Sequence, residues 1–239
     1  MVFKTYHFKS ISSTQDKAKE FASKGLENIA VISDVQTKAR GRFKRKWHSS
    51  RGGLWMSILV KPGNMGKMQY LTFCAAIAAA DSIKKLSKLN VKIKWPNDVH
   101  YNRKKLCGIL TEGHFGKNDY AIIGIGINTN QTKFSNDIKN TAASIKSITH
   151  KNTDIKKLSQ IITTNFFNLY NNYYCKNKFE EIMQKWKSNS DTIGKKVKVI
   201  TTKKTFIGNV INIDEDCNLI IKYKNKKNKI VEGDVSIRY

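Results

Sequence analysis

Residues 91–128 read VKIKWPNDVHYNRKKLCGILTEGHFGKNDYAIIGIGIN and contain three strand-like segments in succession, Val91–Trp95, Leu106–Glu112 and Tyr120–Asn128. Pro96 follows the first segment directly, and because proline cannot donate to a strand ladder, it predicts a turn there. The third segment is apolar on both faces, which is typical of a central strand covered on both sides. This stretch therefore predicts the middle of a β-sheet.

Helical and strand-like segments alternate on either side of this stretch. The alanine-rich run of residues 68–89 has helical spacing and predicts a helix packed closely under the sheet. A second long amphipathic helix is predicted from Leu158 to Tyr173. Strands are also predicted at residues 2–9, Ile29–Val35 and Leu54–Val60, with a short helix that begins at Ser13 between the first two.

The character of the chain changes at about Gly194, where short β-rich segments separated by turns replace the longer elements. Such segments are too small for a large core and are typical of a compact β-barrel. We therefore expect an α+β fold, in which residues 1–190 form a mixed sheet flanked by helices and residues 191–239 form a small β-barrel. The four segments are Lys196–Thr201, Thr205–Ile213, Asn218–Lys224 and Asn228–Val231.

Composition restricts the class of protein. The chain has 239 residues, 40% of them hydrophobic, so it can bury a core and is not expected to be disordered. It contains no run of about 18 apolar residues, and its first residues lack the apolar stretch of a signal peptide. The four cysteines stand singly, without metal-ligand or disulfide spacing. These features predict a cytoplasmic protein without a membrane segment.

The net charge of +26 has two interpretations. Lysine is scattered along the whole chain, and a general drift in amino-acid usage is enough to explain this. The lysines would then simply form a solvated surface. A basic nucleic-acid-binding protein is the alternative, and its binding to RNA or DNA would weaken with salt. The charge would also speed the encounter with an acidic partner.

One loop concentrates the charge. In Gln36–Trp47, which reads QTKARGRFKRKW, seven residues are basic or glycine and no hydrophobic period exists, so we expect a mobile loop. A cationic loop can close over a phosphate-bearing ligand, because arginine binds carboxylate and phosphate through two hydrogen bonds at once. Closure would also expel water from a hydrolysable intermediate. For this stretch alone, a solvated basic loop or a nucleic-acid patch is the alternative.

Two further stretches place polar residues at strand ends. The turn after Trp95 presents Asn97 and Asp98, where Asp98 would hold a metal or orient an amine and a purely structural turn is the alternative. Lys105 begins an apolar strand, with its ammonium directed into a site where it would neutralise a carboxylate attacking a phosphate. Gly108 would let a ligand approach this strand closely. The alternative for Lys105 is an ordinary lysine at a strand start.

The run Gly124-Ile125-Gly126-Ile127-Asn128 lies inside an apolar strand and lacks the following helix and lysine of a phosphate-binding loop. We therefore reject the dinucleotide-binding and P-loop interpretations. Glycines in a strand leave room for a flat ligand or merely ease helix packing, and Asn128 offers a donor and an acceptor to a base edge. No His/Cys cluster fits a metal site, and no Ser elbow or Cys/His pair fits a covalent nucleophile.

Taken together and in this order, these stretches resemble the biotin protein ligase family, also called biotin–acetyl-CoA-carboxylase ligase, over essentially the whole chain. The resemblance implies a catalytic domain of the class II synthetase-like, biotin/lipoate ligase type and an SH3-like C-terminal barrel. It also implies ATP, Mg²⁺ and biotin as substrates, with no tightly bound prosthetic group. The residues that carry it are the Ser13-Thr14 helix start, Gln36 and the Arg-Gly-Arg loop, Lys94–Asp98, Lys105–Glu112 and Gly124–Asn128.

The resemblance also implies roles for particular residues. Lys105, Arg42 and Asp98 would be catalytic, with Lys105 at the junction of carboxylate and phosphate and Asp98 receiving the carrier lysine or the magnesium. Biotin would be bound by Ser13, Thr14, Gln36, Arg40, Arg42, Lys105 and Gly108. The adenylate would be bound by Arg42, Trp47, Lys94, Asn97, Lys105 and Asn128, with Trp47 stacked near the adenine.

The implied reaction has two steps. The biotin carboxylate attacks the α-phosphate of Mg-ATP, giving biotinyl-5′-adenylate and pyrophosphate, and a lysine of a biotin carboxyl carrier domain then attacks this mixed anhydride and releases AMP. A lipoate or octanoate ligase or transferase, which shares the fold and the strand-start lysine, is the alternative enzyme. Because Ser13 lies close to the start, we expect a single-function form without an N-terminal DNA-binding domain and without specific DNA binding. A sheet edge would allow a homodimer.

A few positions depart from the family pattern. Ala39, Phe43 and Lys44 occupy loop positions where glycine, arginine and glycine are common. Gln15 occupies a position where asparagine is common, and Cys217-Asn218 replaces a glycine-containing turn. Because Ala39 and Lys44 disfavour positive φ angles, we expect the loop to close more slowly or less completely.

Overall fold

The computed structural model describes residues 3–116, 118–200, 205–224, 226–231 and 234–237. Its larger unit is built on a seven-stranded mixed sheet in the order β1-β2-β3-β7-β6-β5-β4. β1 and β2 are parallel, and the other neighbouring strands are antiparallel. The strands are β1 (Lys4–Phe8), β2 (Ile29–Ser33), β3 (Leu54–Val60), β4 (Lys92–Lys94), β5 (Asp98–Tyr101), β6 (Lys104–His114) and β7 (Tyr120–Ile127).

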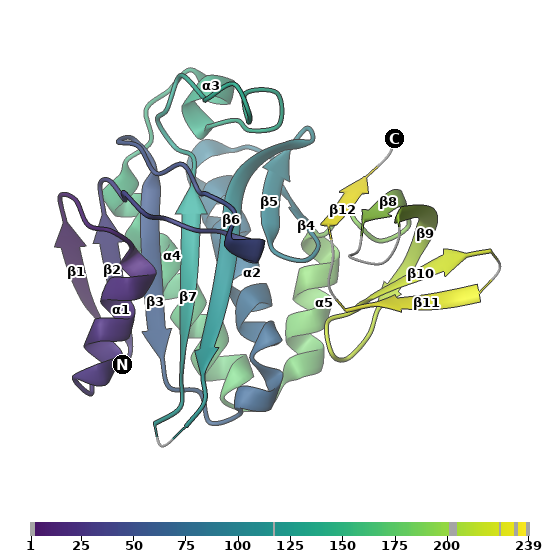
Figure 1. Cartoon of the computed structure of the whole chain (residues 1–239), viewed down its shortest axis with the longest axis horizontal. Helices are drawn as coiled ribbons and strands as arrows, with labels where there is room; N and C mark the ends of the chain where they lie inside the picture. The colour runs from purple at the N-terminus through teal and green to yellow at the C-terminus, as the bar shows by residue number, and fades with distance from the viewer. Residues whose placement is uncertain (1–2, 117, 201–204, 225, 232–233, 238–239) are drawn as a thin grey trace.

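Helices cover both faces of this sheet (Figure 1). One face carries α1 (Thr14–Ser23), and the other carries α2 (Gln69–Ser87), α4 (Ile155–Leu169) and α5 (Phe179–Asn189). The sheet is therefore the middle layer of three, as expected for the α+β class. The shorter helical segments are η1 (Arg42–Lys44), η2 (Met65–Lys67), α3 (Ile145–Thr149) and η3 (Tyr170–Tyr174).

The central position of β7 follows from its alternating side chains. Ile123 and Ile125 pack in the main core with α2, whereas Tyr120 and Ile122 pack with α1 on the opposite face. β7 pairs with β3 on one side and β6 on the other. The prediction of a central strand covered on both sides is confirmed.

The sequence prediction misses β5. The turn after β4 is shorter than the Pro-Asn-Asp pattern suggests, so Asp98 is already the first residue of β5. It pairs with Lys94 of β4 and Gly108 of β6. Asp98 is therefore held by a strand ladder on both sides rather than by a turn. The short helices α3 and α5 are also missing from the sequence prediction.

The C-terminal segments form a five-stranded antiparallel sheet in the order β11-β10-β9-β8-β12, which agrees with the predicted β-rich module. This sheet packs against the larger unit near the turn that precedes β5. The Trp95 indole Nε1 donates to the Cys217 carbonyl at 2.8 Å, and the Tyr70 hydroxyl donates to the Glu215 carbonyl at 2.7 Å. Its strands are β8 (Lys196–Ile200), β9 (Thr205–Ile213), β10 (Leu219–Tyr223), β11 (Lys226–Ile230) and β12 (Asp234–Ile237).

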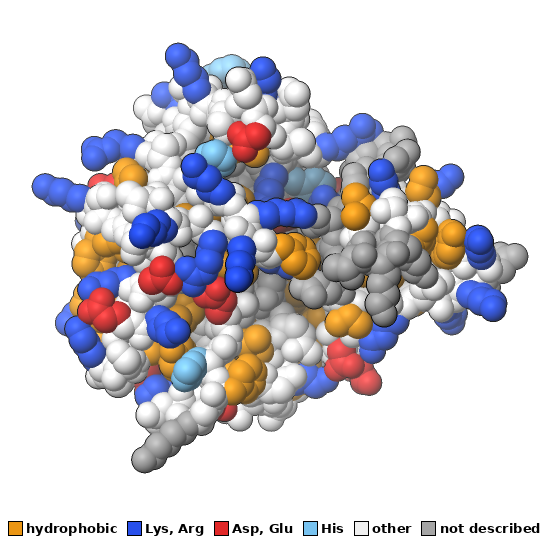
Figure 2. Space-filling model, in the orientation of Figure 1, with side chains coloured by type: hydrophobic (Ala, Val, Ile, Leu, Met, Phe, Trp, Pro, Cys, Tyr) orange, Lys and Arg blue, Asp and Glu red, His pale blue; other side chains and the backbone are white. Residues whose placement is uncertain are grey.

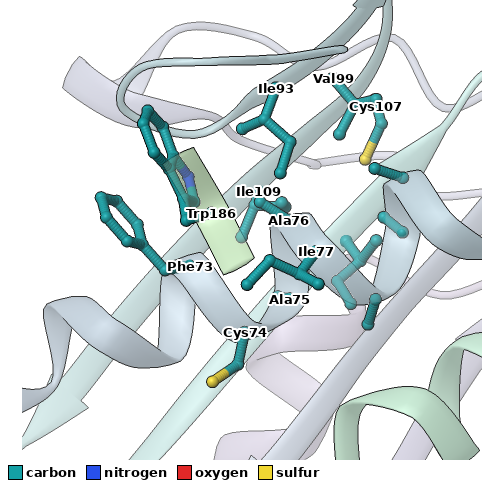
Figure 3. Packing of buried hydrophobic residues seen from close by; sticks show 14 of the residues in the cluster. Phe73, Cys74, Ala75, Ala76, Ile77, Ile93, Val99, Cys107, Ile109 and Trp186 are labelled. Atoms are coloured by element: carbon teal, nitrogen blue, oxygen red, sulfur yellow. The ribbon is translucent and has the colours of Figure 1, made fainter. Parts of the chain in front are cut away.

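Trp186 connects α5 to the main core. Its indole is fully buried and stacks on Phe73 of α2 with ring centroids 4.5 Å apart, and Figure 3 shows the two rings next to each other in the buried cluster. Replacing Trp186 with alanine is expected to lower the free energy of unfolding by about 3–5 kcal/mol, because the cavity left behind cannot fully collapse. Urea denaturation followed by circular dichroism measures this loss. The exposed Gln184→Ala change on the same helix is the control, and a loss below about 1 kcal/mol for Trp186→Ala would contradict the expectation.

Candidate active site

A cavity of about 520 Å³ opens where the start of α1, the basic loop and the strands β6 and β7 meet. Figure 2 shows Lys and Arg side chains gathered in the middle of this face, around the basic loop that crosses in front of the sheet in Figure 1. Every residue to which the sequence analysis gave a role lines this cavity. These residues are Ser13, Thr14, Gln36, Arg40, Arg42, Trp47, Lys94, Asn97, Asp98, Lys105, Gly108 and Asn128.

A buried polar network occupies the α1 side of the cavity. The Ser13 hydroxyl caps α1 by accepting from the backbone amides of Gln15 and Asp16. The Gln36 side-chain carbonyl accepts from the Thr14 amide at 2.7 Å and from its hydroxyl at 3.0 Å. The Gln36 amide group donates to the Ser49 hydroxyl at 3.0 Å. This end of the cavity therefore presents donors and acceptors whose orientation is fixed.

The basic loop forms a closed hairpin-like turn. Arg40 pairs with Lys46 in an antiparallel bridge, and the Trp47 amide donates to the Ala39 carbonyl at 3.1 Å. Phe43 and Lys44 at its tip have φ angles of 55° and 56°, the left-handed region that favours glycine. The two tip residues that depart from the family pattern therefore hold a conformation that costs each of them free energy.

Arg40 is fixed by acidic residues that the sequence analysis did not identify as part of the site. Its Nε and Nη2 donate to the two carboxylate oxygens of Glu112 at 3.1 and 2.9 Å, and its Nη1 donates to Asp16 Oδ1 at 2.8 Å. Gln15 Nε2 donates to the same Glu112 carboxylate. The hydrogen bond to Glu112 is the main cause of the raised pKa of Arg40. We call Arg40, Asp16, Gln15 and Glu112 the Arg40 network.

Lys105 and Asp98 form the charged centre of the cavity. Lys105 Nζ lies 2.6 Å from Asp98 Oδ1 and 5.1 Å from the centroid of the Trp47 ring. The Lys105 backbone donates to the Thr141 carbonyl at 2.7 Å and accepts from the Ala143 amide at 3.1 Å. The segment Thr141–Ala143 thus holds the backbone of Lys105 in place, which fixes the point from which its side chain extends.

Asn97 and Asn128 are tied into this framework. The Asn97 side-chain amide donates to the Ile109 carbonyl at 2.6 Å, so one of its functional groups fixes the turn. Asn128 is buried, and its backbone amide donates to the Leu106 carbonyl at 2.8 Å. Among the described residues, both side chains make their hydrogen bonds through Nδ2, which leaves their side-chain oxygens available to a ligand.

The strand glycines form the floor of the cavity. A Cβ added at Gly126 would lie 2.6 Å from Trp47 Nε1, and one added at Gly124 would overlap the Gln15 side-chain oxygen. The sequence analysis expects these glycines to leave room for a flat ligand or to ease helix packing. In the structure the protein's own Trp47 and Gln15 side chains lie against them. The buried Trp47 Nε1 has no hydrogen-bond partner among the described groups.

Other chemistries find no support in the described part of the chain. It contains no group of three or more His, Cys, Asp or Glu side chains that would hold a metal ion. Burial raises the pKa of the Cys107 thiol, which lies two residues from Lys105, so it is not an ionised nucleophile. None of the described helices combines the length and the apolar character needed to cross a bilayer.

Comparison with protein families identifies the family to which this chain belongs. A model of the Biotin/lipoate A/B protein ligase family matches residues 7–128, and a model of the Biotin protein ligase C terminal domain matches residues 192–238. The chain belongs to the biotin protein ligase family. The C-terminal sheet is therefore the C-terminal domain of this family. Most of the cavity lining lies within the part matched by the Biotin/lipoate A/B protein ligase model, and Ile138, Thr141 and Ala142 lie beyond it.

Relatives from the biotin protein ligase family match between about half and nearly all of the chain. The bifunctional ligase/repressor BirA of Bacillus subtilis is 35% identical over 234 residues, which cover 95% of this chain and 72% of the relative. The biotin–[acetyl-CoA-carboxylase] ligase of Mycobacterium tuberculosis is 28% identical over 120 residues, 48% of this chain and 44% of the relative. Among solved structures, the biotin protein ligase from Aquifex aeolicus in complex with biotin and ATP superimposes with a TM-score of 0.87 at 28% identity, covering 98% of both chains.

Proposed function

We propose that this protein uses ATP to attach biotin to a lysine of the biotin carboxyl carrier domain of a carboxylase, through biotinyl-5′-AMP. The observation that carries the proposal is the position of Lys105, which lies in the cavity beside Asp98 and the Trp47 ring. The chain's membership of the biotin protein ligase family and its likeness to a ligase structure holding biotin and ATP support this proposal.

The charge of the cavity suits a reaction between two anions. Seven of the described lining residues are Lys or Arg, and Asp98 is the single acidic one among them. A carboxylate that attacks a phosphate must approach like charge, and fixed cations in a partly closed site offset this repulsion most strongly as charge develops. Lys105 and Arg42 would supply this stabilisation, and the alignment of the two substrates would supply the rest.

The polar end of the cavity suits the ureido ring of biotin. A ureido group has two N–H donors and one carbonyl acceptor, and the network around Thr14 and Gln36 offers both donors and acceptors in fixed positions. A site built on such pairs rejects a ligand that leaves them unpaired. Lipoate lacks a ureido group, so this network favours biotin over the alternative acids.

In the second step, a carrier lysine must reach the adenylate as a neutral amine. The Asp98 carboxylate pairs with Lys105 in the same centre, its side chain is 21% exposed, and it would orient this amine or receive its proton. The Mg²⁺ would enter with the ATP phosphates as part of the substrate, and Asp98 would be the carboxylate that contacts it. Lys105 would stabilise the leaving AMP.

Intact mass of a purified apo carrier domain tests the proposal. After incubation with the protein, Mg-ATP and biotin, we expect one biotinyl addition per carrier, and no addition when ATP is omitted. A parallel reaction with lipoate should give no gain. A lipoyl gain would keep the fold and overturn the substrate, and no gain with either acid from folded protein would overturn the proposed function.

A further inference from the structure

Glu112 contacts the basic loop but does not line the cavity. We propose that Glu112 is a positioning residue that holds the basic loop closed through Arg40, so that the adenylate stays bound until the carrier lysine arrives. The role in adenylate retention rests on the proposed function. The role in loop position rests on the geometry alone and can be tested separately.

The contact between Glu112 and Arg40 fixes orientation as well as distance. Two parallel hydrogen bonds, at 3.1 and 2.9 Å, join the guanidinium to both carboxylate oxygens. A pair of this kind is directional and stronger than a single neutral hydrogen bond. Asp16 in the first turn of α1 accepts a third bond from Arg40 at 2.8 Å. The loop is thus attached to β6 and to α1 through one side chain.

Gln15 connects this attachment to the floor of the cavity. Its amide group donates to Glu112, and its oxygen lies against Gly124 at the centre of β7. Gln15 is 6% exposed, so its position is set by packing. An asparagine, which is common at this position in the family, is one methylene shorter and would not span the same distance. The departure at Gln15 is therefore part of the device that orients Glu112.

The position of Arg40 is linked to that of Trp47 by hydrogen bonds within the loop. Arg40 bridges Lys46 across the loop, and the neighbouring Trp47 amide donates to the Ala39 carbonyl. At the tip, Phe43 and Lys44 hold left-handed φ angles that oppose this closed conformation. The hydrogen bonds from Arg40 to Glu112 and Asp16 offset this cost in free energy. Because the three side chains of Arg40, Glu112 and Asp16 are 33%, 40% and 47% exposed, salt will weaken the attachment.

Pyrophosphate release without carrier measures adenylate retention. With biotin and Mg-ATP, we expect the unaltered protein to release one pyrophosphate per site in a burst, followed by a slow phase limited by loss of the adenylate. Glu112→Gln should keep the burst amplitude and speed the slow phase about tenfold, the loss of one charge-assisted contact. Arg40→Lys should also speed the slow phase, and the slow phase of the double variant should be no faster than that of either single variant. A slow phase within twofold of the unaltered rate, or additive effects in the double variant, would overturn the proposal.

The matched control is Glu27→Gln, which removes the surface ion pair with Lys61 at the opposite end of β2 and β3. It should leave the burst and the slow phase unchanged. Trypsin cleavage of the ligand-free protein within Arg42–Lys46 gives a readout that needs no catalysis, and Glu112→Gln should be cut about tenfold faster there. Asp16→Asn is the second variant should Glu112→Gln not fold. An absent burst in the unaltered protein would refute the proposed function, and equal cleavage rates would refute the role of Glu112.

Discussion

Replacing Lys105 with alanine is expected to lower the rate of adenylate formation about 10²–10³-fold, the usual effect of removing one fixed group that stabilises charge in a transition state. The change removes the cation that lies 2.6 Å from Asp98 Oδ1 and faces the Trp47 ring. The rate of the pyrophosphate burst with biotin and Mg-ATP measures this step directly, because the carrier takes no part in it.

Lys104→Ala is the matched control for this variant. Lys104 is the preceding residue of β6, is exposed and does not line the cavity, so its removal changes the net charge equally. Its burst rate should stay within about twofold of the unaltered protein. A Lys105→Ala rate reduced less than fivefold, in protein with an unchanged melting temperature, would remove Lys105 from the proposed mechanism.

Replacing Gly126 with valine is expected to raise the KM for ATP at least tenfold. The added Cβ would lie 2.6 Å from Trp47 Nε1, so the indole must move away from the floor of the cavity. Stacking of a base on an aromatic side chain contributes about 1–3 kcal/mol, and displacement of the indole would forfeit the contact with adenine that we propose for Trp47. Pyrophosphate release as a function of ATP concentration, at saturating biotin, measures the effect.

Gly63→Val controls for the cost of replacing a glycine, because a Cβ at Gly63 meets nothing within 4 Å. Its KM for ATP should equal that of the unaltered protein. Trp47→Ala should reproduce the higher KM without a clash in the sheet, and serves in place of Gly126→Val should the latter not fold. An unchanged KM for ATP in both Gly126→Val and Trp47→Ala would contradict the assignment of Trp47 to the adenine.

Much of the site could be predicted because its residues stand at the ends of sheet strands. Lys105 lies near the start of β6, and the antiparallel pairing of β6 with β7 places this start beside the end of β7, where Cys107 pairs with Ile127. Asn128 directly follows β7 and therefore lies at the same edge of the sheet, where its amide donates to the Leu106 carbonyl. The order of these two segments along the chain therefore predicts that Lys105 and Asn128 meet, whereas Asp98 reaches Lys105 from a position opposite Gly108.

The Arg40 network could not be predicted in the same way. Glu112 lies 72 positions from Arg40, and nothing in a single sequence distinguishes a carboxylate that pairs with a loop from one that faces solvent. Gln15 was noticed only as a departure from the family pattern. The strand β5 was missed because its four residues, Asp98–Tyr101, carry no alternation long enough to show against a turn signal. Long-range pairing and short elements are decided by tertiary contacts.

The contact between Trp95 and Cys217 has a consequence for genetic screens. Asp98 follows Trp95 closely in the chain. The Trp95 indole Nε1 donates to the carbonyl of Cys217, a residue of the C-terminal domain whose φ is 63°. A β-branched residue at Cys217 cannot hold that backbone angle without strain. Variants selected for loss of biotinylation should therefore include changes at Cys217, and a map of such variants on the sequence would show two separate clusters for one catalytic centre.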